Sequence, residues 1–552
     1  MQIEHVKIKN FRNLIDFEID FTKMKTVLIG QNASGKSNFL EAIVLIFKQL
    51  DYMDRKESRT ELLFEYEIIY ICYKNRIKII HKKDEQGRYR YEFLKSDALV
   101  IIGKDTFQKI ENFKENRDKY LPKYVFAYYS GLGNSNRLEE YFLEHKKAFA
   151  DEARKIKDDK VPKPTRLLYA ELIHSQLSVL SFFLQEDKDA IKFLEDNLGI
   201  LSIESILLSI FEPDWSTKAK MESEMEYKFF GSSGVVRNLL YHLHDEVAFA
   251  PIRDVVKPKT DLWQKVKNKK GIDVIYLYIQ DIEKIRKYIQ DKDWNIFQFF
   301  HVLNTANVSK LLTREGIQLR VRKKTANHIQ FKELSEGEQQ LLTVLGLMRF
   351  TVTDEALFLL DEPDTHLNPY WQWKYMDFIN QIVLQEKDSN NTIQVIMTSH
   401  SPLSIGSLTK EEVRIFYNDE TGKVGTYIPD EDPQGMGVEG ILTSIFGLPT
   451  VLDLIAQRKI DRRDELYNKK FHSDERLSNE EEKEYKKLFD ELEYIGIKSS
   501  HIDPIYEKFL QAYKARFQNK GKENRALNPE EIAERKRIAE EILKSLLDEE
   551  NK

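Results

Sequence analysis

Apolar and polar residues alternate over two stretches in the N-terminal part of the chain. Residues 15–21 place Ile, Phe, Ile and Phe at every second position, and residues 61–95 repeat the pattern. Alternation with a period of two predicts strands with one buried face. Residues 26–29, Thr-Val-Leu-Ile, instead form a short apolar run that is typical of a strand buried on both faces. The sequence therefore predicts a buried core strand beside an antiparallel meander.

Later apolar runs predict more core strands, and helical spacing follows several of them. Residues 38–50 and the segment after Ser335 have the periodicity of helices that bury one face. Strands joined by such helices are typical of an α/β fold. The further predicted strands lie at residues 125–129, 317–321, 328–331, 356–360 and 393–398.

The chain has 552 residues, too many for one hydrophobic core, because single cores stop growing at about 250–300 residues. The expected fold class is α/β, with a mixed central sheet, flanking helices, an antiparallel β meander, a helical insertion and a helical C-terminal extension. The predicted parts are an N-terminal head lobe (1–136), the helical insertion (137–314), a C-terminal head lobe (315–454) and the helical extension (455–552).

Composition excludes several classes of protein. The formal net charge of −6 argues against a protein that coats nucleic acid, although it leaves room for a local basic groove. A single cysteine, Cys72, excludes an internal disulfide framework and a multi-cysteine zinc site. The N-terminus lacks the features of a signal peptide, and no apolar run reaches the about 18 residues of a membrane span. We expect a cytoplasmic protein without a membrane partner.

A phosphate-binding loop of the form G-x-x-x-x-G-K-[ST] occupies residues 30–37, between a predicted strand and a predicted helix. Backbone N–H groups of such a loop surround a β-phosphate, and the start of the following helix adds a favourable dipole. Lys36 is expected to neutralise phosphate charge, and Ser37 to offer its hydroxyl to Mg²⁺. The other residues expected to contact the nucleotide here are Gly30, Asn32, Ser34, Gly35 and Asn38.

Three further candidate groups follow apolar strands, where ligands of α/β sheets bind. Asp361 is expected to hold Mg²⁺ through a water molecule, and Glu362 to polarise the attacking water. His400 is expected to sense the γ-phosphate or donate a hydrogen bond to it. Each alone could be an ordinary polar residue at a strand end. Their order along the chain favours a nucleotide site in which Lys36, Glu362 and His400 are catalytic.

Residues 334–338, Leu-Ser-Glu-Gly-Glu, open a predicted helix. Ser335 can cap this helix and Glu338 can complete a capping box, so a well-capped helix is one interpretation. The other is that Ser335, Gly337 and Glu338 bind the γ-phosphate of ATP held by a second copy of the chain. Both interpretations can hold together.

Taken together, these motifs resemble the ABC-type ATPases, and among them the branch that contains the SMC and RecF proteins. The resemblance covers residues 1–50 and about 315–418 and includes Asn10-Phe11-Arg12 and Leu359 to Pro363. Glu336 and Glu338 stand where transporter ATPases usually have Gly and Gln, which favours the SMC-like branch. The glutamine of the family's Q-loop is not identifiable, and residues 128–131 occupy roughly its place.

The resemblance implies ATP and Mg²⁺ as cofactors and places Arg12 close to the nucleotide phosphates. It also implies a homodimer, or a higher oligomer built from it, in which Lys36 of one chain and Ser335 of the other hold each ATP. The compact insertion, with residues 128–131 and 445–448, is similar to ATPase subunits of anti-phage defence systems of the Septu (PtuA-like) and retron-associated types. The implied function is an ATPase that regulates a partner effector, expected to be a nuclease subunit.

Three alternatives share part of this pattern. A DNA repair or chromosome-maintenance ATPase of the RecF type would use the same motifs, with nucleic acid as a possible partner of the basic segments 257–270 and 320–324. Solvated faces are the simpler explanation of those segments. A transporter ATPase is disfavoured by the insertion. An ATPase-Toprim nuclease would need a metal-binding acidic set, and the acidic residues available are Glu411, Glu412, Asp430, Glu431, Asp432 and Glu439.

Overall fold

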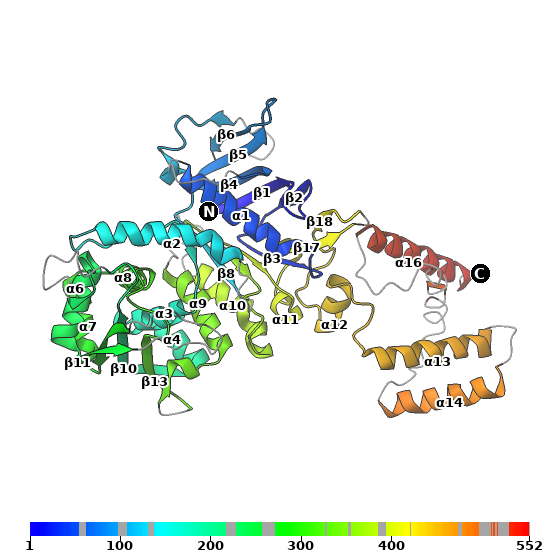
Figure 1. The fold of residues 1–552 in the computed structure, drawn as a ribbon. Helices are drawn as coiled ribbons and strands as arrows, with labels where there is room; N and C mark the ends of the chain where they lie inside the picture. Colours follow the sequence, from blue (N-terminus) through cyan, green and yellow to red (C-terminus); the bar gives the residue numbers. More distant parts are fainter. Residues whose placement is uncertain are drawn as a thin grey trace.

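The structure is a computed structural model, and it places the head of the molecule between the insertion and the C-terminal helices (Figure 1). The residues that it describes are 1–53, 62–97, 107–130, 137–216, 228–256, 271–325, 328–350, 355–384, 393–419, 421–472, 477–495, 509, 512–513, 516 and 529–550.

A seven-stranded sheet forms the centre of the head, in the order β18-β17-β3-β16-β15-β8-β9. All neighbours pair in parallel except β17 and β18. All residues of β15 and β16 are buried, as their continuous apolar runs predict. The strands are β3 (Lys25–Gly30), β8 (Tyr124–Tyr129), β9 (Leu167–Tyr169), β15 (Ala356–Asp361), β16 (Ile393–Thr398), β17 (Val413–Asn418) and β18 (Val424–Tyr427).

The predicted antiparallel meander is present as a second sheet, in the order β2-β1-β4-β5-β6-β7. Helix α1 (Lys36–Tyr52) shares one hydrophobic core with this sheet. The mixed α/β fold expected from the sequence is thus confirmed. The strands are β1 (Gln2–Lys9), β2 (Phe17–Asp20), β4 (Glu65–Cys72), β5 (Asn75–Lys83), β6 (Tyr89–Asp97) and β7 (Gln108–Lys109).

The central sheet separates two hydrophobic cores. Leu357 and Leu359 of β15 belong to the core beneath α1 and the meander, whereas Phe358 and Leu360 belong to the core shared with the insertion. Successive side chains of a strand point to opposite faces, so one strand contributes to both cores. The position of the nucleotide loop therefore depends on packing from both sides of the sheet.

The region from 137 to 314, expected to be mostly helical, contains the predicted helices and also strands that the sequence analysis missed. A third sheet has the order β11-β12-β10-β13-β14. The strands are β10 (Ile200–Phe211), β11 (Phe249–Val256), β12 (Ile272–Ile279), β13 (Ile317–Lys323) and β14 (Ile329–Gln330), and the helices are α2 (Arg137–Lys155), α3 (Ile173–Leu184), α4 (Lys188–Phe193), α6 (Gly234–His242), α7 (Ile282–Asp291) and α8 (Ile296–Val308).

The error has a physical cause in β10. Its pairing with β13 shifts register between Ile200 and Ser202 and again between Ile203 and Ser205. Each β-bulge inserts an extra residue, so the buried positions Ile200, Ile203 and Ile206 are three apart rather than two. A spacing of three resembles one face of a helix. The predicted boundaries at residues 136, 314 and 454 stay predictions. Strands β13 and β14 lie beyond residue 314 but pair within the sheet of the insertion.

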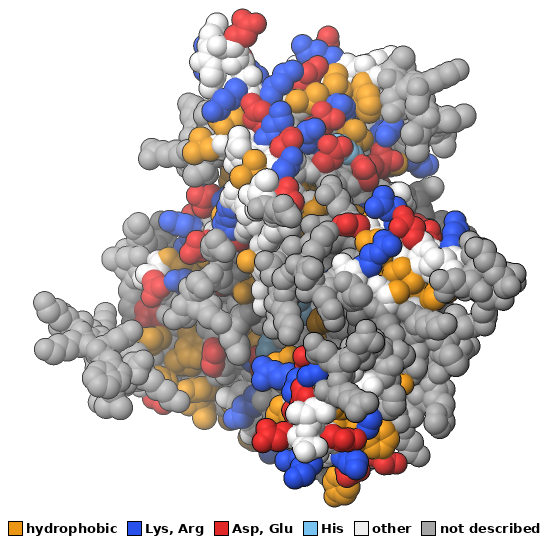
Figure 2. All heavy atoms as spheres, turned by 90° about the vertical axis from the view of Figure 1, so that its right-hand side faces the viewer, with side chains coloured by type: hydrophobic (Ala, Val, Ile, Leu, Met, Phe, Trp, Pro, Cys, Tyr) orange, Lys and Arg blue, Asp and Glu red, His pale blue; other side chains and the backbone are white. Residues whose placement is uncertain are grey.

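The C-terminal helices extend away from the head (Figure 1). Ion pairs join α13 and α14, among them Lys459–Glu491 at 2.7 Å and Lys469–Glu481 at 2.8 Å. Charges of both signs are interspersed on this face (Figure 2), and exposed pairs of this kind stabilise a fold only slightly. The remaining helices are α9 (Glu336–Phe350), α10 (Pro369–Leu384), α11 (Pro402–Ile405), α12 (Val438–Gly440), α13 (Leu454–His472), α14 (Asn479–Tyr494) and α16 (Pro529–Glu550).

Gln394, a fully buried polar residue of β16, connects the two sheets of the head. Its Oε1 accepts a hydrogen bond from the Ile3 N–H at 2.7 Å, and its Nε2 donates to the Ile3 carbonyl at 3.1 Å. The side-chain amide thus pairs with β1 as a neighbouring strand would. Buried backbone groups that lose such partners destabilise a fold.

We predict that Gln394→Leu lowers the free energy of unfolding by about 2–4 kcal/mol, because both backbone groups of Ile3 lose their partner. Gln318→Leu, at an exposed position of β13, is the matched control and should change stability by less than about 0.5 kcal/mol. Urea denaturation followed by circular dichroism measures both. Equal stability of the two variants would contradict the role of Gln394.

Candidate functional site

The phosphate-binding loop connects the end of β3 to the start of α1. Gly30 and Gly35 have φ angles of 144° and 98°, and a Cβ on Gly30 would lie 2.3 Å from the Phe416 carbonyl oxygen. Glycine is therefore required at Gly30. Gly35 is the N-cap of α1 and no side chain caps this helix, so its first N–H groups remain available to a bound anion.

Lys36 is folded onto its own loop. Its ammonium donates to the carbonyls of Gly30 and Gln31 at 2.8 and 2.9 Å and lies 3.4 Å from Ser34 Oγ. Burial lowers the pKa of Lys36 to about 8, although the charges of Asp361 and Glu362 oppose the shift. The ammonium is therefore held where a phosphate would be a better partner than neutral carbonyls.

Asp361 lies at the end of β15, and strand register brings Thr398 of β16 beside it. The Thr398 hydroxyl donates to Asp361 Oδ1 at 2.6 Å. Burial raises the pKa of Asp361, while hydrogen bonds with Thr398 and Ser37 oppose the shift. Ser37 and Asp361 thus lie together, and they supply the oxygen ligands that Mg²⁺ prefers.

Glu362 follows in a left-handed conformation, with φ of 51°. Its N–H donates to Thr398 Oγ1 at 2.9 Å, and its Oε1 lies 3.5 Å from His400 Nε2. Burial lowers the pKa of His400, and the nearby charge of Lys36 lowers it further. The structure therefore brings Lys36, Glu362 and His400 close enough for their charges to interact, and the Glu362 carboxylate is partly exposed.

The sequence analysis missed a buried group behind this site. Asp364 accepts hydrogen bonds from the hydroxyls of Ser399 and Ser404, both at 2.5 Å. Burial raises the pKa of Asp364, and the two hydroxyls oppose that shift. This network holds the loop that carries His400 against the segment after β15. The sequence feature that could have revealed this group is a third carboxylate, three residues after Asp361.

The segment at 334–338 forms the predicted capping box. The Ser335 N–H donates to Glu338 Oε2 at 2.7 Å, and the Glu338 N–H donates to Ser335 Oγ at 3.2 Å. A Cβ on Gly337 would lie 2.6 Å from the His366 carbonyl oxygen, so α9 starts in close contact with the segment after Asp364. Among the residues that the structure describes, no hydrogen bond or ion pair joins Ser335, Gly337 or Glu338 to the loop at 30–37.

Arg12 lies near the loop but is already engaged. Its guanidinium donates to Asn38 Oδ1 at 2.9 Å and to the Tyr141 hydroxyl at 3.0 Å, and it forms an ion pair with Glu41. Asn32 is exposed on the loop and Ser34 is buried beneath it. Arg12 and Asn38 thus contact each other, and the contact of either residue with nucleotide stays a prediction.

Residues 128–130 end β8 next to the candidate site, and Gly131 lies outside the described residues. The Ser130 N–H donates to the Asp361 carbonyl at 3.2 Å. Two of the acidic residues considered for a Toprim site have other partners: Glu412 lies 3.2 Å from Lys25, and Asp432 accepts from the Lys410 N–H at 2.7 Å. Within the described ranges, no three His, Cys, Asp or Glu side chains are grouped so that they could hold a metal.

The basic segments give little support for a groove. Residues 257–270 lie outside the described residues. Arg320 and Arg322 are exposed on β13, and Lys324 lies 3.1 Å from Glu195. In the described part of the chain, no helix has the length and apolar character needed to cross a membrane.

Comparison with known proteins identifies the head. Residues 1–405 match the family model described as AAA ATPase domain. A segment of 132 residues is 31% identical to Septu protein PtuA of Bacillus mycoides, covering 22% of this chain and 17% of that protein. A segment of 46 residues is 46% identical to the DNA replication and repair protein RecF of Trichormus variabilis, covering 8% of this chain and 12% of RecF. The matched segments thus span less than a fifth of either relative.

Two solved structures align with most of the chain at low similarity. The SMC head domain from Thermotoga maritima aligns over 78% of this chain and 99% of its own length, at 11% identity and a TM-score of 0.32. The recombination mediator protein RecF aligns over 77% of this chain and 97% of its own, at 14% identity and a TM-score of 0.27. The family match confirms an ATPase domain, and the sequence relatives confirm the predicted resemblance to RecF and to Septu PtuA.

We predict that Gly337→Ala destabilises the chain by about 1–3 kcal/mol, because the new Cβ must displace the backbone of His366. Gly437→Ala is the matched control, since a Cβ there meets open space at an ordinary φ of −65°. Differential scanning fluorimetry compares the two melting temperatures. A Gly337→Ala variant as stable as Gly437→Ala would show that the contact with His366 is not tight.

A second prediction concerns the buried charge of Lys36. Below pH 8 both folded and unfolded chains carry this proton, and the folded chain bears the burial cost. Between about pH 8 and 10.5 only the unfolded chain keeps it, so wild-type stability rises relative to Lys36→Met. We expect Lys36→Met to be more stable by about 1–3 kcal/mol at pH 7 and to lose this advantage by pH 10.

The control is Lys23→Met, at an exposed position just before β3. Its stability difference from the wild type should not change across the same pH range. Thermal unfolding without nucleotide, measured at half-unit steps of pH, gives all three curves. A Lys36→Met curve parallel to the wild type would contradict the buried-charge interpretation.

Proposed function

Since the chain belongs to the AAA ATPase domain family, we propose that it binds ATP with Mg²⁺ at residues 30–37 and hydrolyses it within a dimer. One observation carries this proposal. Lys36, the adjacent Asp361 and Glu362, and His400 come from three separate places in the sequence and meet at the carboxyl ends of three adjacent parallel strands. Ligands of α/β sheets bind at this edge.

The residues present fit a Mg²⁺–triphosphate. The uncapped start of α1 and the glycines of the loop offer backbone N–H groups to phosphate oxygens. Ser37 and Asp361 would hold the metal, and Lys36 would exchange two carbonyl partners for phosphate oxygens. When bound, ATP supplies the phosphoanhydride bond and Mg²⁺ offsets the charge of its phosphates.

The chain's own groups would then handle the proton of the attacking water. Glu362 would accept that proton, since its carboxylate is partly exposed and lies close enough to Lys36 of the loop for their charges to interact. His400, whose pKa is lowered by burial, would stay largely neutral and orient the carboxylate from 3.5 Å. The Asp364 network would hold His400 in this position.

We further propose that the site is shared between two chains. The Ser335 oxygen accepts a hydrogen bond from Glu338, so its own proton is still available to a phosphate. Its separation from the loop at 30–37 within one chain supports donation to a second chain. Each ATP would then lie between the loop of one protomer and the start of α9 of its partner, in a symmetric dimer.

The output of this cycle would be control of a partner effector, a nuclease subunit acting in anti-phage defence. The similarity to Septu protein PtuA supports this choice. The RecF match keeps a DNA repair ATPase as the second candidate. No described acidic cluster supports nuclease chemistry in this chain itself. Purification with neighbouring gene products and mass analysis would separate the two, since a stably bound nuclease favours defence and a lone ATPase that binds DNA ends favours repair.

Complementation between two inactive variants tests the shared site. We predict that Lys36→Ala and Ser335→Arg each abolish ATP turnover. Mixed in equal amounts, they should recover about a quarter of wild-type turnover, because half the dimers are mixed and each has one intact site of two. Steady-state phosphate release at several total concentrations measures the recovery.

The control mixture pairs Lys36→Ala with Glu362→Gln, because both substitutions fall on the same side of the shared site. In that mixed dimer one site has Glu362 but lacks Lys36, and the other has Lys36 but lacks Glu362, so both sites should stay inactive. Absence of recovery in the first mixture, with both variants folded, would contradict the shared site and leave only single-chain hydrolysis.

A further inference from the structure

A network of side-chain hydrogen bonds leads from the phosphate-binding loop to the insertion. Asn13 Nδ2 donates to the Ala33 carbonyl in the loop at 3.1 Å, and Asn13 Oδ1 accepts from Asn38 Nδ2 at 2.6 Å. Asn38 Oδ1 accepts from the Arg12 guanidinium, which also donates to the Tyr141 hydroxyl at 3.0 Å. Tyr141 belongs to α2, so four side chains, which we call the loop network, connect the loop to the first helix of the insertion.

The loop network holds backbone that is strained without it. Ala33 has a φ angle of 62°, and Arg12 has one of 54°. This left-handed conformation costs free energy in residues other than glycine, so surrounding contacts must hold it. A Cβ on Gly35 would lie 3.2 Å from both terminal atoms of Asn13, which places Asn13 against the turn into α1. Asn13 therefore fixes the shape of the loop before a phosphate binds, and a preformed site binds with less loss of entropy.

The other end of the loop network is built around the carboxylate of Glu41. This side chain is buried, forms an ion pair with Arg12 and accepts from the Tyr141 hydroxyl at 3.1 Å. A buried carboxylate requires such partners. The hydroxyl accepts one hydrogen bond and donates the other, so its proton has a fixed direction. Tyr141 therefore restrains the guanidinium of Arg12 that holds Asn38.

One face of α2 is attached to α1. Tyr141, Glu144 and His145 are three and four residues apart and so share this face. Glu144 lies 2.7 Å from Lys48 of α1, and the rings of His145 and Tyr52 have centroids 3.8 Å apart. The contacts of Tyr141 thus belong to a continuous interface between the two helices.

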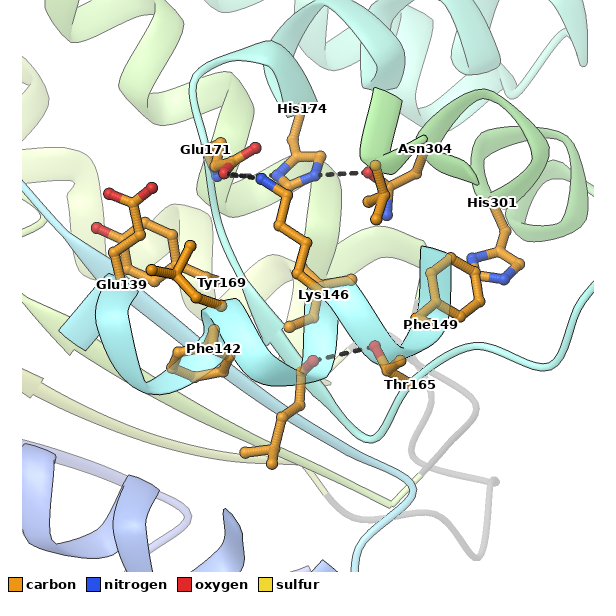
Figure 3. Close-up of a pocket in the computed structure, with 14 residues that line it drawn as sticks. Glu139, Phe142, Lys146, Phe149, Thr165, Tyr169, Glu171, His174, His301 and Asn304 are labelled. Atoms are coloured by element: carbon orange, nitrogen blue, oxygen red, sulfur yellow. Dashed lines mark hydrogen bonds and ion pairs between the residues drawn. The ribbon is translucent and has the colours of Figure 1, made fainter. Parts of the chain in front are cut away.

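The opposite face of α2 is attached to the rest of the insertion. Figure 3 shows Lys146 reaching from α2 to Glu171, with the His174 imidazole beside them and Asn304 on its other side. His174 Nδ1 accepts from the Glu171 N–H at 2.9 Å, and its Nε2 lies 3.1 Å from Asn304 Oδ1 of α8. The position of α2, and with it that of Tyr141, therefore depends on the packing of the insertion.

We propose that Tyr141 is a positioning residue through which the insertion sets the affinity of the phosphate-binding loop for nucleotide. This inference rests on the proposed nucleotide site at residues 30–37. A change in the insertion that moves α2 would release Arg12, loosen the hold of Asn13 on the loop and weaken nucleotide binding. Bound nucleotide would in turn favour the attached position of α2, because coupling between two sites is reciprocal.

The test is isothermal titration of ADP with Mg²⁺ into the full-length chain. ADP requires only the loop of one chain, so its binding does not depend on a site shared between two chains. We expect Tyr141→Phe to weaken ADP binding about fivefold, because a hydrogen bond to a charged group is lost while the ring remains. Tyr494→Phe, at a 91% exposed position in α14, is the matched control and should bind as the wild type does.

A double-mutant cycle with Asn13→Ala separates transmission through the loop network from a general effect on the fold. In the Asn13→Ala chain, Tyr141→Phe should change ADP affinity by less than about 1.5-fold, because the connection to Ala33 is already broken. A merely structural hydroxyl would lower the affinity by the same factor in both backgrounds. Circular dichroism establishes that each variant is folded, and Asn38→Ala, which breaks the same network, serves where Asn13→Ala does not fold.

Equal ADP affinity of the wild type and Tyr141→Phe would overturn the inference, and so would independent effects of the two substitutions in the cycle. Failure of the wild-type chain to bind ADP would instead refute the nucleotide site on which the inference rests. The two failures are distinguishable, because the first requires normal binding by the wild type.

Discussion

The parallel pairing of β3, β16 and β15 is the constraint on which the rest of the head depends. Adjacent parallel strands end at the same edge of a sheet, so three segments far apart in the sequence deliver their polar ends to one place. The register sets Asp361 beside Thr398, and the Thr398 hydroxyl then contacts both Asp361 and the backbone of Glu362. A shift of one residue would turn these side chains to the opposite face.

This edge is rigid because the sheet is packed on both faces. Alternate residues of β15 enter two different cores, one shared with α1 and the meander and one shared with the insertion. Gln394 adds a polar connection between β16 and β1 inside that packing. Helix α2 of the insertion also enters the first core directly, through Leu138 and Phe142. The insertion and the nucleotide loop are thus connected through packed cores, and within the described ranges no hydrogen bond or ion pair joins the two directly.

Sequence reasoning was accurate where one local signal agreed with the tertiary structure. The apolar runs at β15 and β16 predict buried strands because such strands have no polar face, and Ser335 and Glu338 predict a capping box because its bonds are local. It failed at β10, where two bulges give the buried positions a helical spacing. It also missed the bonds from Ser399 and Ser404 to Asp364, because no spacing rule connects residues that only the sheet register brings together.

The start of α9 shows why a complete nucleotide site needs more than one chain in the proposed mechanism. A helix N-terminus attracts anions through its free N–H groups, and the capping box uses part of that capacity inside the chain. In the proposed mechanism, the Ser335 hydroxyl and the other first-turn N–H groups would donate to a phosphate. The close contact between Gly337 and His366 fixes this helix start against the segment that follows Asp364. Each chain would therefore present the start of α9 to its partner. The segment after Asp361, which forms part of the chain's own site, would fix the position of that helix.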